Sequence, residues 1–277
     1  MIVLSGRCVV LTGASGGIGA PLAGALVRRG AHVIAVGRQA AGLEALVDQH
    51  GARAITALAA DVTDPAGRQR VASAARNHSA SLLVLAHAQP AFGLFDEQPE
   101  RLLRSVIDAN LIAPMLLIRD LMPVLANHRQ AAVVAIGSTL GNLAHPGFVA
   151  YGASKFGLRG LIEGLAREHA DTVVTFQHLA PRATRTAFNS AAAEAMNREL
   201  GVTHDDPAEV AERLAWAIED GERRLQLGWP ESLFVRINSL WPALVDKSLS
   251  KKLAIVRRHA SARNPNKDRL EATHDQA

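Results

Sequence analysis

Short runs of apolar, often β-branched residues recur along the chain, separated by longer segments in which apolar residues return every three or four positions. Runs that are apolar throughout are typical of strands covered on both faces, and the longer spacing is typical of amphipathic helices. The runs predict seven strands, at 8–13, 32–37, 54–61, 81–87, 131–138, 172–179 and 223–228. The spacing predicts helices near 17–30, 40–50, 65–78, 99–126, 151–170 and 207–220. This alternation predicts an α/β fold, a doubly wound parallel sheet with helices on both faces.

Residues 230–260 follow the last predicted strand and show the spacing of one amphipathic helix. Pro242 should kink or divide it, because proline lacks a backbone N–H and clashes with the preceding turn. The apolar stripe consists of Phe234, Ile237, Trp241, Val245, Leu249, Leu253 and Val256. Basic residues gather toward its C-terminal end: Lys247, Lys251, Lys252, Arg257 and Arg258. The chain is therefore expected to consist of an α/β domain over 1–229, a helical extension over 230–260 and a disordered polar tail over 261–277.

Two interpretations of the 230–260 extension stay open. In the first, the helix packs on its own domain or on a dimer partner, and its charges are solvated. In the second, it is an interfacial helix that rests on anionic lipid or forms the wall of a channel for a long apolar substrate. The second interpretation leads to the hypotheses of peripheral membrane contact and of a hydrophobic acyl or lipid-like carbonyl substrate.

Composition narrows the class of protein. The 277 residues are 48% hydrophobic and 20% charged, which predicts a globular chain with a sizeable core. The net charge of +4 is too mild and too scattered to favour nucleic-acid binding. Cys8 is the single cysteine, no apolar stretch is long enough to span a bilayer, and no secretion signal is evident, so we expect a cytoplasmic protein. The eleven histidines show no metal-ligand spacing, and no metal is expected.

The first predicted strand ends in the glycine-rich sequence "LTGASGGIGAPL". Glycine permits a tight turn and lets backbone N–H groups approach a pyrophosphate at a helix N-terminus. An ordinary glycine-rich turn is the alternative, but the position between a strand and a helix favours dinucleotide binding. No Gly-Lys-Ser/Thr follows, so the sequence is not a Walker loop.

The ends of the second and third strands bear on the choice of cofactor. A carboxylate at the end of the second strand would read a free ribose 2′-hydroxyl, whereas a cation would read a 2′-phosphate. The chain has Gly37 and Arg38 there, which favours NADP over NAD, unless the arginine is merely solvated. Asp61 follows the third strand, where it is expected either to accept a hydrogen bond from an adenine amino group or to cap a helix.

Tyr151 is the only tyrosine in the chain, and Lys155 lies four residues later. On a helix, this spacing places the two side chains on one face. A nearby ammonium and a positively charged nicotinamide should lower the pKa of the phenol, which makes a general acid/base for carbonyl–alcohol interconversion. Ser138, at the end of the fifth strand, is placed to donate a hydrogen bond to a carbonyl oxygen. Asn110 lies within a predicted helix, an unfavourable position unless its amide has a polar task.

Over residues 5–228, the chain resembles the short-chain dehydrogenase/reductase family and its Rossmann fold. The resemblance rests on "TGASGGIG", on "DV" at 61–62 and on the spacing of a catalytic tetrad: Asn110, Ser138, Tyr151 and Lys155. It implies that Tyr151 is the acid/base, that Ser138 orients the carbonyl, that Lys155 binds the nicotinamide ribose and lowers the tyrosine pKa, and that Asn110 supports a water. The implied cofactor-binding residues are Gly13, Ser15, Gly17, Ile18, Gly19, Arg38, Asp61, Val62, Ala88, Tyr151, Lys155 and Thr186.

Two stretches depart from the family pattern. The usual Asn-Asn-Ala-Gly reads "AHAQ" at 86–89, which puts the local packing against the cofactor in doubt, and His87 is expected to be structural. The usual Pro-Gly-x-x-x-Thr reads "PRATRT". Thr186 still matches, as a contact for the nicotinamide carboxamide, but Arg182 replaces the glycine. Arg182 and Arg185 are expected to bind an anionic part of the substrate or to reach solvent.

These observations predict an NADP(H)-dependent oxidoreductase that interconverts a carbonyl and an alcohol. The alternative is a catalytically weak or inactive cofactor-binding protein with a regulatory role, suggested by "AHAQ" at 86–89. The resemblance further implies a homo-oligomer and a mobile helical lid over 188–200.

Overall fold

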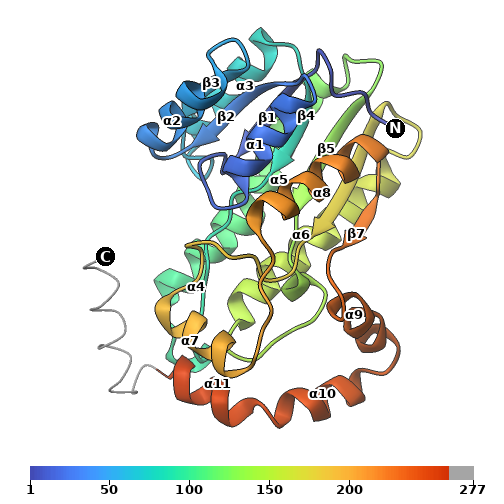
Figure 1. The fold of residues 1–277 in the computed structure, drawn as a ribbon. Helices are drawn as coiled ribbons and strands as arrows, with labels where there is room; N and C mark the ends of the chain where they lie inside the picture. Colours follow the sequence, from blue (N-terminus) through green and yellow to red (C-terminus); the bar gives the residue numbers. More distant parts are fainter. Residues whose placement is uncertain (262–277) are drawn as a thin grey trace.

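The computed structural model describes residues 1–261, and the sheet forms as expected, with all seven strands parallel (Figure 1). The strand order is β3-β2-β1-β4-β5-β6-β7. The strands are β1 Cys8–Thr12, β2 His32–Gly37, β3 Ile55–Ala59, β4 Ala80–Leu85, β5 Ala131–Ile136, β6 Val174–Ala180 and β7 Arg224–Gln226. Chain order reverses between β1 and β4, the switch point at which open parallel sheets bind ligands.

Helices cover both faces of the sheet, as the doubly wound prediction requires. Within β1, Val9 and Leu11 belong to one apolar core, whereas Cys8 and Val10 belong to another, because successive side chains of a strand point to opposite faces. Helices α1 (Gly19–Arg28), α2 (Ala40–His50) and α8 (Pro207–Asp220) contribute to the first core. Helices α3 (Pro65–Asn77), α5 (Ala113–Leu125) and α6 (Val149–Glu168) contribute to the second.

Two helix starts follow the signals in the sequence. The Asp64 carboxylate accepts a hydrogen bond of 3.1 Å from the backbone N of Gly67, and α3 begins at Pro65. The Asp206 carboxylate accepts one of 2.8 Å from the N of Ala208, where α8 begins. Each aspartate satisfies a backbone donor that the first helical turn leaves unpaired, so both N-cap predictions are confirmed.

The long helix predicted over 99–126 is interrupted. Helix α4 (Glu100–Ile107) leads into a π-helical turn, η2 (Asp108–Ile112), and α5 then continues to Leu125. A π-turn widens the helix by one residue and often marks a functional position. Asn110 lies at its centre, fully buried.

Three short helices form the C-terminal extension: α9 (Glu231–Leu240), α10 (Pro242–Ser250) and α11 (Leu253–Ala260) (Figure 1). The chain divides at Pro242, as predicted. The predicted apolar stripe is present but only partly buried, with Ile237, Leu249 and Leu253 half-buried. Val245 and Val256 are buried, whereas the Trp241 side chain is 61% exposed. In residues 1–261, no helix combines the length and apolarity needed to cross a membrane.

Helix α11 folds back onto α7 (Ala191–Glu199), which begins where the lid was predicted. The Glu199 carboxylate accepts hydrogen bonds from Arg258 at 2.6 Å and from His259 at 2.7 Å. The two helices also share a small apolar core, which includes Met196 and Val256. The domain boundaries at 229 and 260 stay predictions, and the predicted tail lies outside the described residues from 262 onward.

Candidate active site

The loop after β1 forms a tight turn in front of α1. Gly13 has a φ of +67°, and a Cβ placed there would lie 2.7 Å from the backbone N of His87. A Cβ at Gly19 would collide with the carbonyl oxygen of Gly13. Only glycine fits these two positions. Ile18 precedes the helix and provides no side-chain cap, so the N-terminus of α1 offers backbone N–H groups to an anion such as pyrophosphate.

The ends of β2 and β3 lie next to this loop. The hydroxyl oxygen of Ser15 would lie 3.1 Å from a Cβ at Gly37, and Arg38 is exposed beside them. The Asp61 carboxylate accepts hydrogen bonds from the N of Thr63 at 2.9 Å and from its hydroxyl at 2.7 Å. Burial acts to raise the pKa of Asp61, but these hydrogen bonds and the charge of Arg38 outweigh it and hold that pKa below its usual range. Asp61 therefore braces its loop and caps no helix.

The remaining predicted cofactor residues come from three separate loops. Val62 is buried after β3. Ala88 packs in the small apolar cluster that contains Tyr151. The side chain of Thr186 lies directly against Gly17 of the phosphate loop. The structure thus brings Thr186, a residue after β6, to the loop after β1.

Tyr151 and Lys155 lie one turn apart in α6 and are buried, with 7% and 3% exposure. The Lys155 Nζ donates a hydrogen bond of 3.0 Å to the backbone carbonyl of Ile136, the last residue of β5. The same Nζ lies 5.9 Å from the centre of the Tyr151 ring. Burial lowers the pKa of Lys155 to about 8. The predicted pair is therefore assembled, with its lysine anchored to the sheet.

The expected lowering of the tyrosine pKa does not occur in the protein alone. Burial raises the pKa of Tyr151 to about 12, and the hydroxyl of Ser138 acts only weakly in the opposite direction. The ammonium of Lys155 is directed to Ile136 and is not among the groups that lower this pKa. Ser138 itself follows β5, and its hydroxyl accepts a hydrogen bond of 3.1 Å from the N of Leu140.

Asn110 uses its amide to hold another loop. Its Oδ1 accepts a hydrogen bond of 2.7 Å from the N of Gln89, and its Nδ2 donates to the Gln89 carbonyl at 3.0 Å. The Nδ2 also donates to the hydroxyl of Ser154 at 3.0 Å, which donates in turn to the Tyr151 carbonyl at 2.6 Å. These bonds are the polar task that justifies an asparagine in a helix. They link the loop after β4 to the helix that carries Tyr151.

The unusual "AHAQ" stretch is accommodated by this network. Gln89 stands where the family has glycine, and its side chain donates a hydrogen bond of 2.9 Å to the hydroxyl of Ser105 in α4. The His87 Nδ1 lies 2.6 Å from the hydroxyl of Thr12. Burial, followed by the charge of Lys155, lowers the pKa of His87 to about 4. His87 is therefore neutral at physiological pH and structural, as expected.

His178 was not singled out by the sequence, although it lies under the active site. It is buried in β6, and its ring fills the space that a side chain at Gly137 would occupy. Gly137 immediately precedes Ser138, so the imidazole supports the backbone that carries this hydroxyl. Burial, followed by the charge of Lys155, lowers the pKa of His178 to about 4. A single histidine within an apolar strand is the only sequence signal of this role.

Apolar side chains pack around the Tyr151 ring. The Phe188 ring meets the Tyr151 ring edge-on, with centroids 5.7 Å apart. Leu140 belongs both to the cluster of Tyr151 and to a second cluster under α7 and α11. The aromatic and aliphatic members of that second cluster are Phe92, Leu94, Phe148, Met196, Leu200, Ile255 and Val256. Beside the polar groups of Ser138 and Lys155, the neighbours of the Tyr151 ring are therefore apolar.

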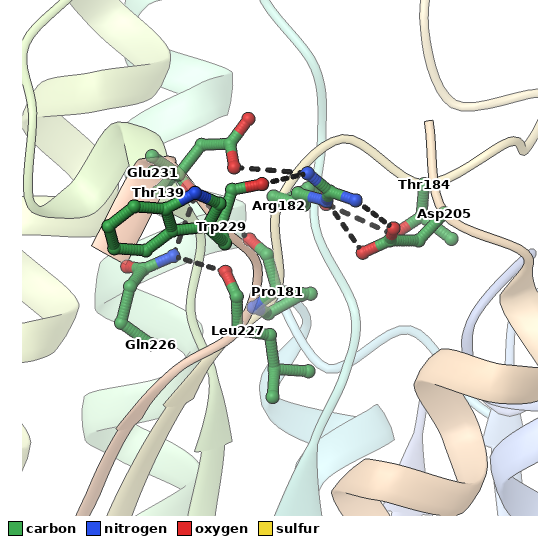
Figure 2. A network of polar contacts seen from close by, with 9 residues as sticks. All are labelled: Thr139, Pro181, Arg182, Thr184, Asp205, Gln226, Leu227, Trp229 and Glu231. Atoms are coloured by element: carbon green, nitrogen blue, oxygen red, sulfur yellow. Dashed lines mark hydrogen bonds and ion pairs between the residues drawn. The ribbon is translucent and has the colours of Figure 1, made fainter. Parts of the chain in front are cut away.

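The Arg182 guanidinium is paired within the protein and is left neither for an anionic part of a substrate nor for solvent. Figure 2 shows its guanidinium between three partners: both carboxylate oxygens of Asp205, at 2.6 and 2.9 Å, the Trp229 carbonyl at 2.9 Å and the Glu231 carboxylate at 3.1 Å. The hydrogen bonds to Asp205 are the main reason that the pKa of Arg182 is raised. This finding corrects both expectations for Arg182, which ties the loop after β6 to the starts of α8 and α9. Arg185 is exposed.

Gln226 in β7 makes a second connection between distant segments that the sequence does not predict. Its Nε2 donates hydrogen bonds to the hydroxyl of Thr139 at 2.8 Å and to the Leu227 carbonyl at 3.0 Å (Figure 2). Its Oε1 accepts from Asn142 at 2.8 Å. Thr139 follows Ser138, so β7 helps to fix the segment that carries the predicted carbonyl-orienting hydroxyl.

Two further features were sought in the described part of the chain: a cluster of metal ligands and a hollow near Tyr151. Residues 1–261 hold no cluster of three histidine, cysteine or carboxylate side chains suited to a metal ion. An open hollow of about 670 Å³ lies between α9 and α10, lined by Leu240, Trp241, Pro242, Ala243 and Leu244. None of these residues belongs to the apolar clusters around Tyr151.

Comparison with known proteins shows the family of the chain. The family model for short chain dehydrogenase matches residues 7–197. The 3-oxoacyl-[acyl-carrier-protein] reductase FabG of Escherichia coli is 29% identical over 224 residues, which cover 78% of this chain and 91% of FabG. A short-chain dehydrogenase from Streptomyces avermitilis is 31% identical, with a TM-score of 0.76 over 89% of this chain and 98% of its own.

A structure of lower sequence identity has the same fold. The short-chain dehydrogenase/reductase of Burkholderia phymatum in complex with NAD is 22% identical, with a TM-score of 0.80, and covers 88% of this chain and 97% of its own. At this identity the likeness concerns the fold alone. Together with the family match, these comparisons show that the chain belongs to the short-chain dehydrogenase/reductase family, a family of NAD(P)-dependent oxidoreductases.

Proposed function

We propose that this chain interconverts a ketone or aldehyde and the corresponding alcohol, with NADP(H) as hydride carrier and Tyr151 as general acid/base. One observation carries the proposal. The only tyrosine of the chain is buried beside the hydroxyl of Ser138, one turn from a buried lysine that is anchored to the end of β5. A binding module has no need of this pair, whereas proton transfer to a carbonyl oxygen does.

The chain offers a cofactor cradle at the same edge of the sheet. The turn from Gly13 to Gly19 and the uncapped N-terminus of α1 suit the pyrophosphate. Asp61 and Val62 suit the adenine, and Lys155 and Thr186 suit the nicotinamide end, as the family resemblance implies. When bound, the nicotinamide supplies a hydride to the carbonyl carbon or accepts one from the alcohol.

The side chains of the protein transfer the proton. In reduction, the Tyr151 hydroxyl donates its proton to the carbonyl oxygen while Ser138 donates a hydrogen bond to the same oxygen. A phenol with a pKa of about 12 stays protonated, which suits this direction. In oxidation, Tyr151 must accept the alcohol proton as a phenolate, so the positive charge of the oxidised nicotinamide has to lower its pKa.

The preference for NADP(H) rests on the end of β2. Gly37 presents no carboxylate to repel a 2′-phosphate, and the exposed guanidinium of Arg38 lies close enough to influence Asp61. The Burkholderia phymatum structure holds NAD, so the fold does not by itself require NADP. The choice therefore depends on these side chains.

The surroundings of Tyr151 favour a hydrophobic acyl or lipid-like substrate. Phe188 and Leu140 flank the phenol, and a further apolar cluster follows under α7 and α11. FabG acts, by its name, on a 3-oxoacyl chain carried by a protein. An apolar chain next to the reacting carbonyl would replace side-chain contacts within these clusters, whereas a sugar hydroxyl there would lack partners.

A cofactor-binding protein without catalysis is the second candidate, because "AHAQ" departs from the family pattern. The bonds from Asn110 to the Gln89 peptide support the enzyme instead, since they keep this loop ordered. A screen of ketones and aldehydes of increasing chain length, followed by loss of NADPH absorbance, separates the two candidates. Turnover that rises with chain length supports the proposal. NADPH binding without any turnover would favour the regulatory candidate.

We further propose a homo-oligomer in the cytoplasm. Exposed apolar residues recur on one face of η2 and α5, at Ile112 and Met115, and on one face of α6, at Val149 and Phe156. Such patches on packed helices suit a contact between copies. Light scattering of the purified chain should give at least twice the monomer mass, and Met115→Glu with Phe156→Glu should reduce it. A wild-type mass of one chain would contradict this part of the proposal.

A further inference from the structure

The exposed surface of α9, α10 and the elbow between them carries apolar and cationic side chains. We propose that this surface, the α9–α10 patch, docks the protein on an anionic lipid membrane. Its apolar members are Leu233, Leu240, Trp241 and Leu244, all exposed, and its cations are Arg236, Lys247 and Lys251. The inference concerns where the protein works and does not depend on its reaction.

The outer face of α9 carries one cation between two leucines. Leu233, Arg236 and Leu240 follow one another at intervals of three and four residues, so they lie along one side of the helix. All three are exposed, and Leu240 is 67% exposed. A guanidinium between leucines can reach lipid phosphates while the leucines enter the acyl boundary, because long cationic side chains extend their charge to the polar layer.

Helix α10 repeats the arrangement. Val245 is the buried residue of this helix and defines its inner face. Leu244, Lys247 and Lys251 follow at intervals of three and four residues and lie on the opposite side. Leu244 is 61% exposed. The two helices therefore direct the same combination of leucine and cation outward.

Trp241 joins the two outer faces. It occupies the turn before Pro242 and is 61% exposed, next to the open hollow of about 670 Å³ between the helices. An exposed tryptophan is unfavourable in water but well suited to the interface between headgroups and acyl chains, where its ring is buried and its N–H finds a partner. The segment also lies at one end of the molecule, where α9, α10 and α11 follow one another (Figure 1), so a flat surface can reach it.

Charge indicates an anionic partner. Glu231 at the start of α9 is engaged by Arg182, and Asp246 is the other carboxylate of α9 and α10. Within residues 1–261, neither Arg236, Lys247 nor Lys251 has a carboxylate at ion-pair distance. A second copy of this chain fits less well, because a two-fold contact would bring these cations against their own copies. Phosphate headgroups over an apolar layer complement both properties of the patch.

Sedimentation with vesicles tests the proposal on the full chain. Wild-type protein should bind vesicles of phosphatidylglycerol and phosphatidylcholine, bind pure phosphatidylcholine poorly, and dissociate as salt is raised. Lys247→Gln with Lys251→Gln should weaken binding about twenty-five-fold, since each cation near an anionic surface contributes about fivefold. Leu240→Ser with Trp241→Ser should abolish it. Arg70→Gln and Trp216→Ser, which alter exposed residues of α3 and α8, are the matched controls.

Fluorescence locates the contact. The chain has three tryptophans, so a Trp216→Phe, Trp229→Phe variant reports Trp241 alone. Anionic vesicles should shift its emission to shorter wavelength, and lipids brominated near the headgroup should quench it. Wild-type protein that stays in the supernatant at low salt would overturn the proposal. So would a Leu240→Ser, Trp241→Ser variant that loses mass in solution, because the patch would then be an interface between copies.

Discussion

Lys155 donates its hydrogen bond to the backbone carbonyl of Ile136, at 3.0 Å, and not to the phenol one turn away. The lysine is thereby held at the end of β5, close to Ser138, and its ammonium lies over the tyrosine ring at 5.9 Å from the centroid. Within the protein alone, burial therefore controls the ionisation of Tyr151. In the proposed mechanism, the charge of the oxidised cofactor therefore has to favour the phenolate.

The ionisation of the Tyr151 phenol can be measured directly, because Tyr151 is the only tyrosine of the chain. In cofactor-free protein at pH 10.5, the absorbance of phenolate at 295 nm should stay below about a tenth of its full value, since the pKa is near 12, against about 10 for a free phenol. Saturating NADP⁺ should increase it. Protein unfolded in guanidinium provides the reference for an unperturbed phenol. Half-ionisation near pH 10 in the folded, cofactor-free protein would contradict the role of burial.

Arg38 should determine the choice of cofactor. Arg38→Glu removes a cation and adds a carboxylate. We expect NADPH binding to weaken by about tenfold to a hundredfold, the strength of one charge-assisted contact. NADH binding should change little or improve. Fluorescence titration of both cofactors measures this. Arg70→Glu makes the same change of charge on the exposed side of α3 and should leave the preference intact. Equal loss for NADPH and NADH would remove Arg38 from 2′-phosphate recognition.

Removal of the Arg182 side chain should destabilise the chain. The guanidinium and the Asp205 carboxylate are only 15% and 18% exposed, so Arg182→Ala leaves a largely buried carboxylate without its partner. We expect the free energy of unfolding in urea to fall by about 2–3 kcal/mol. Arg104→Ala is the matched control, because its ion pair with Glu100 is 75% exposed on both sides and should contribute little. A loss for Arg182→Ala no larger than that control would refute the anchoring role.

Acid should destabilise the protein through two buried histidines. The pKa of His87 and that of His178 are each about 4 in the folded protein, against about 6.5 when unfolded. The unfolded state therefore binds more protons between pH 6.5 and 4, so stability is complete above 6.5 and is lost as the pH falls through this window. At pH 5, we expect a loss of about 2 kcal/mol per histidine, measured by urea unfolding.

A variant separates this effect from general acid denaturation. His178→Gln should lose less stability between pH 7 and pH 5 than the wild type does, whereas His128→Gln, at the end of a helix near the surface, should keep the wild-type slope. If the slopes of wild type and His178→Gln coincide, the titration of His178 does not account for the acid sensitivity.

The sequence predicts the parts of this molecule that depend on local pattern. The seven strands and the caps at Asp64 and Asp206 follow from apolar runs and from residues next to the elements they start. The pair of Tyr151 and Lys155 follows from helical spacing. These features are encoded within a few residues, so they can be read without knowledge of the fold.

The remaining features depend on contacts between distant segments. Arg182 meets Asp205 and Trp229, which lie 23 and 47 residues away, and no local pattern indicates such partners. The amide of Asn110, in the π-turn, binds the Gln89 peptide, 21 residues earlier. How deeply each residue of the 230–260 stripe is buried depends on such contacts as well. In α11, the buried side is the one that packs on α7 and on the loop that contains Phe92.

The central claim is that Tyr151 transfers the proton to and from the substrate oxygen. The most direct test is Tyr151→Phe, in which NADPH affinity and turnover of an accepted carbonyl are measured on the same preparation. We expect the dissociation constant for NADPH to stay within about threefold of the wild-type value, while turnover falls by a factor on the order of 10²–10⁴. Turnover that is unchanged, with NADPH binding intact, would contradict the claim and remove Tyr151 from the mechanism.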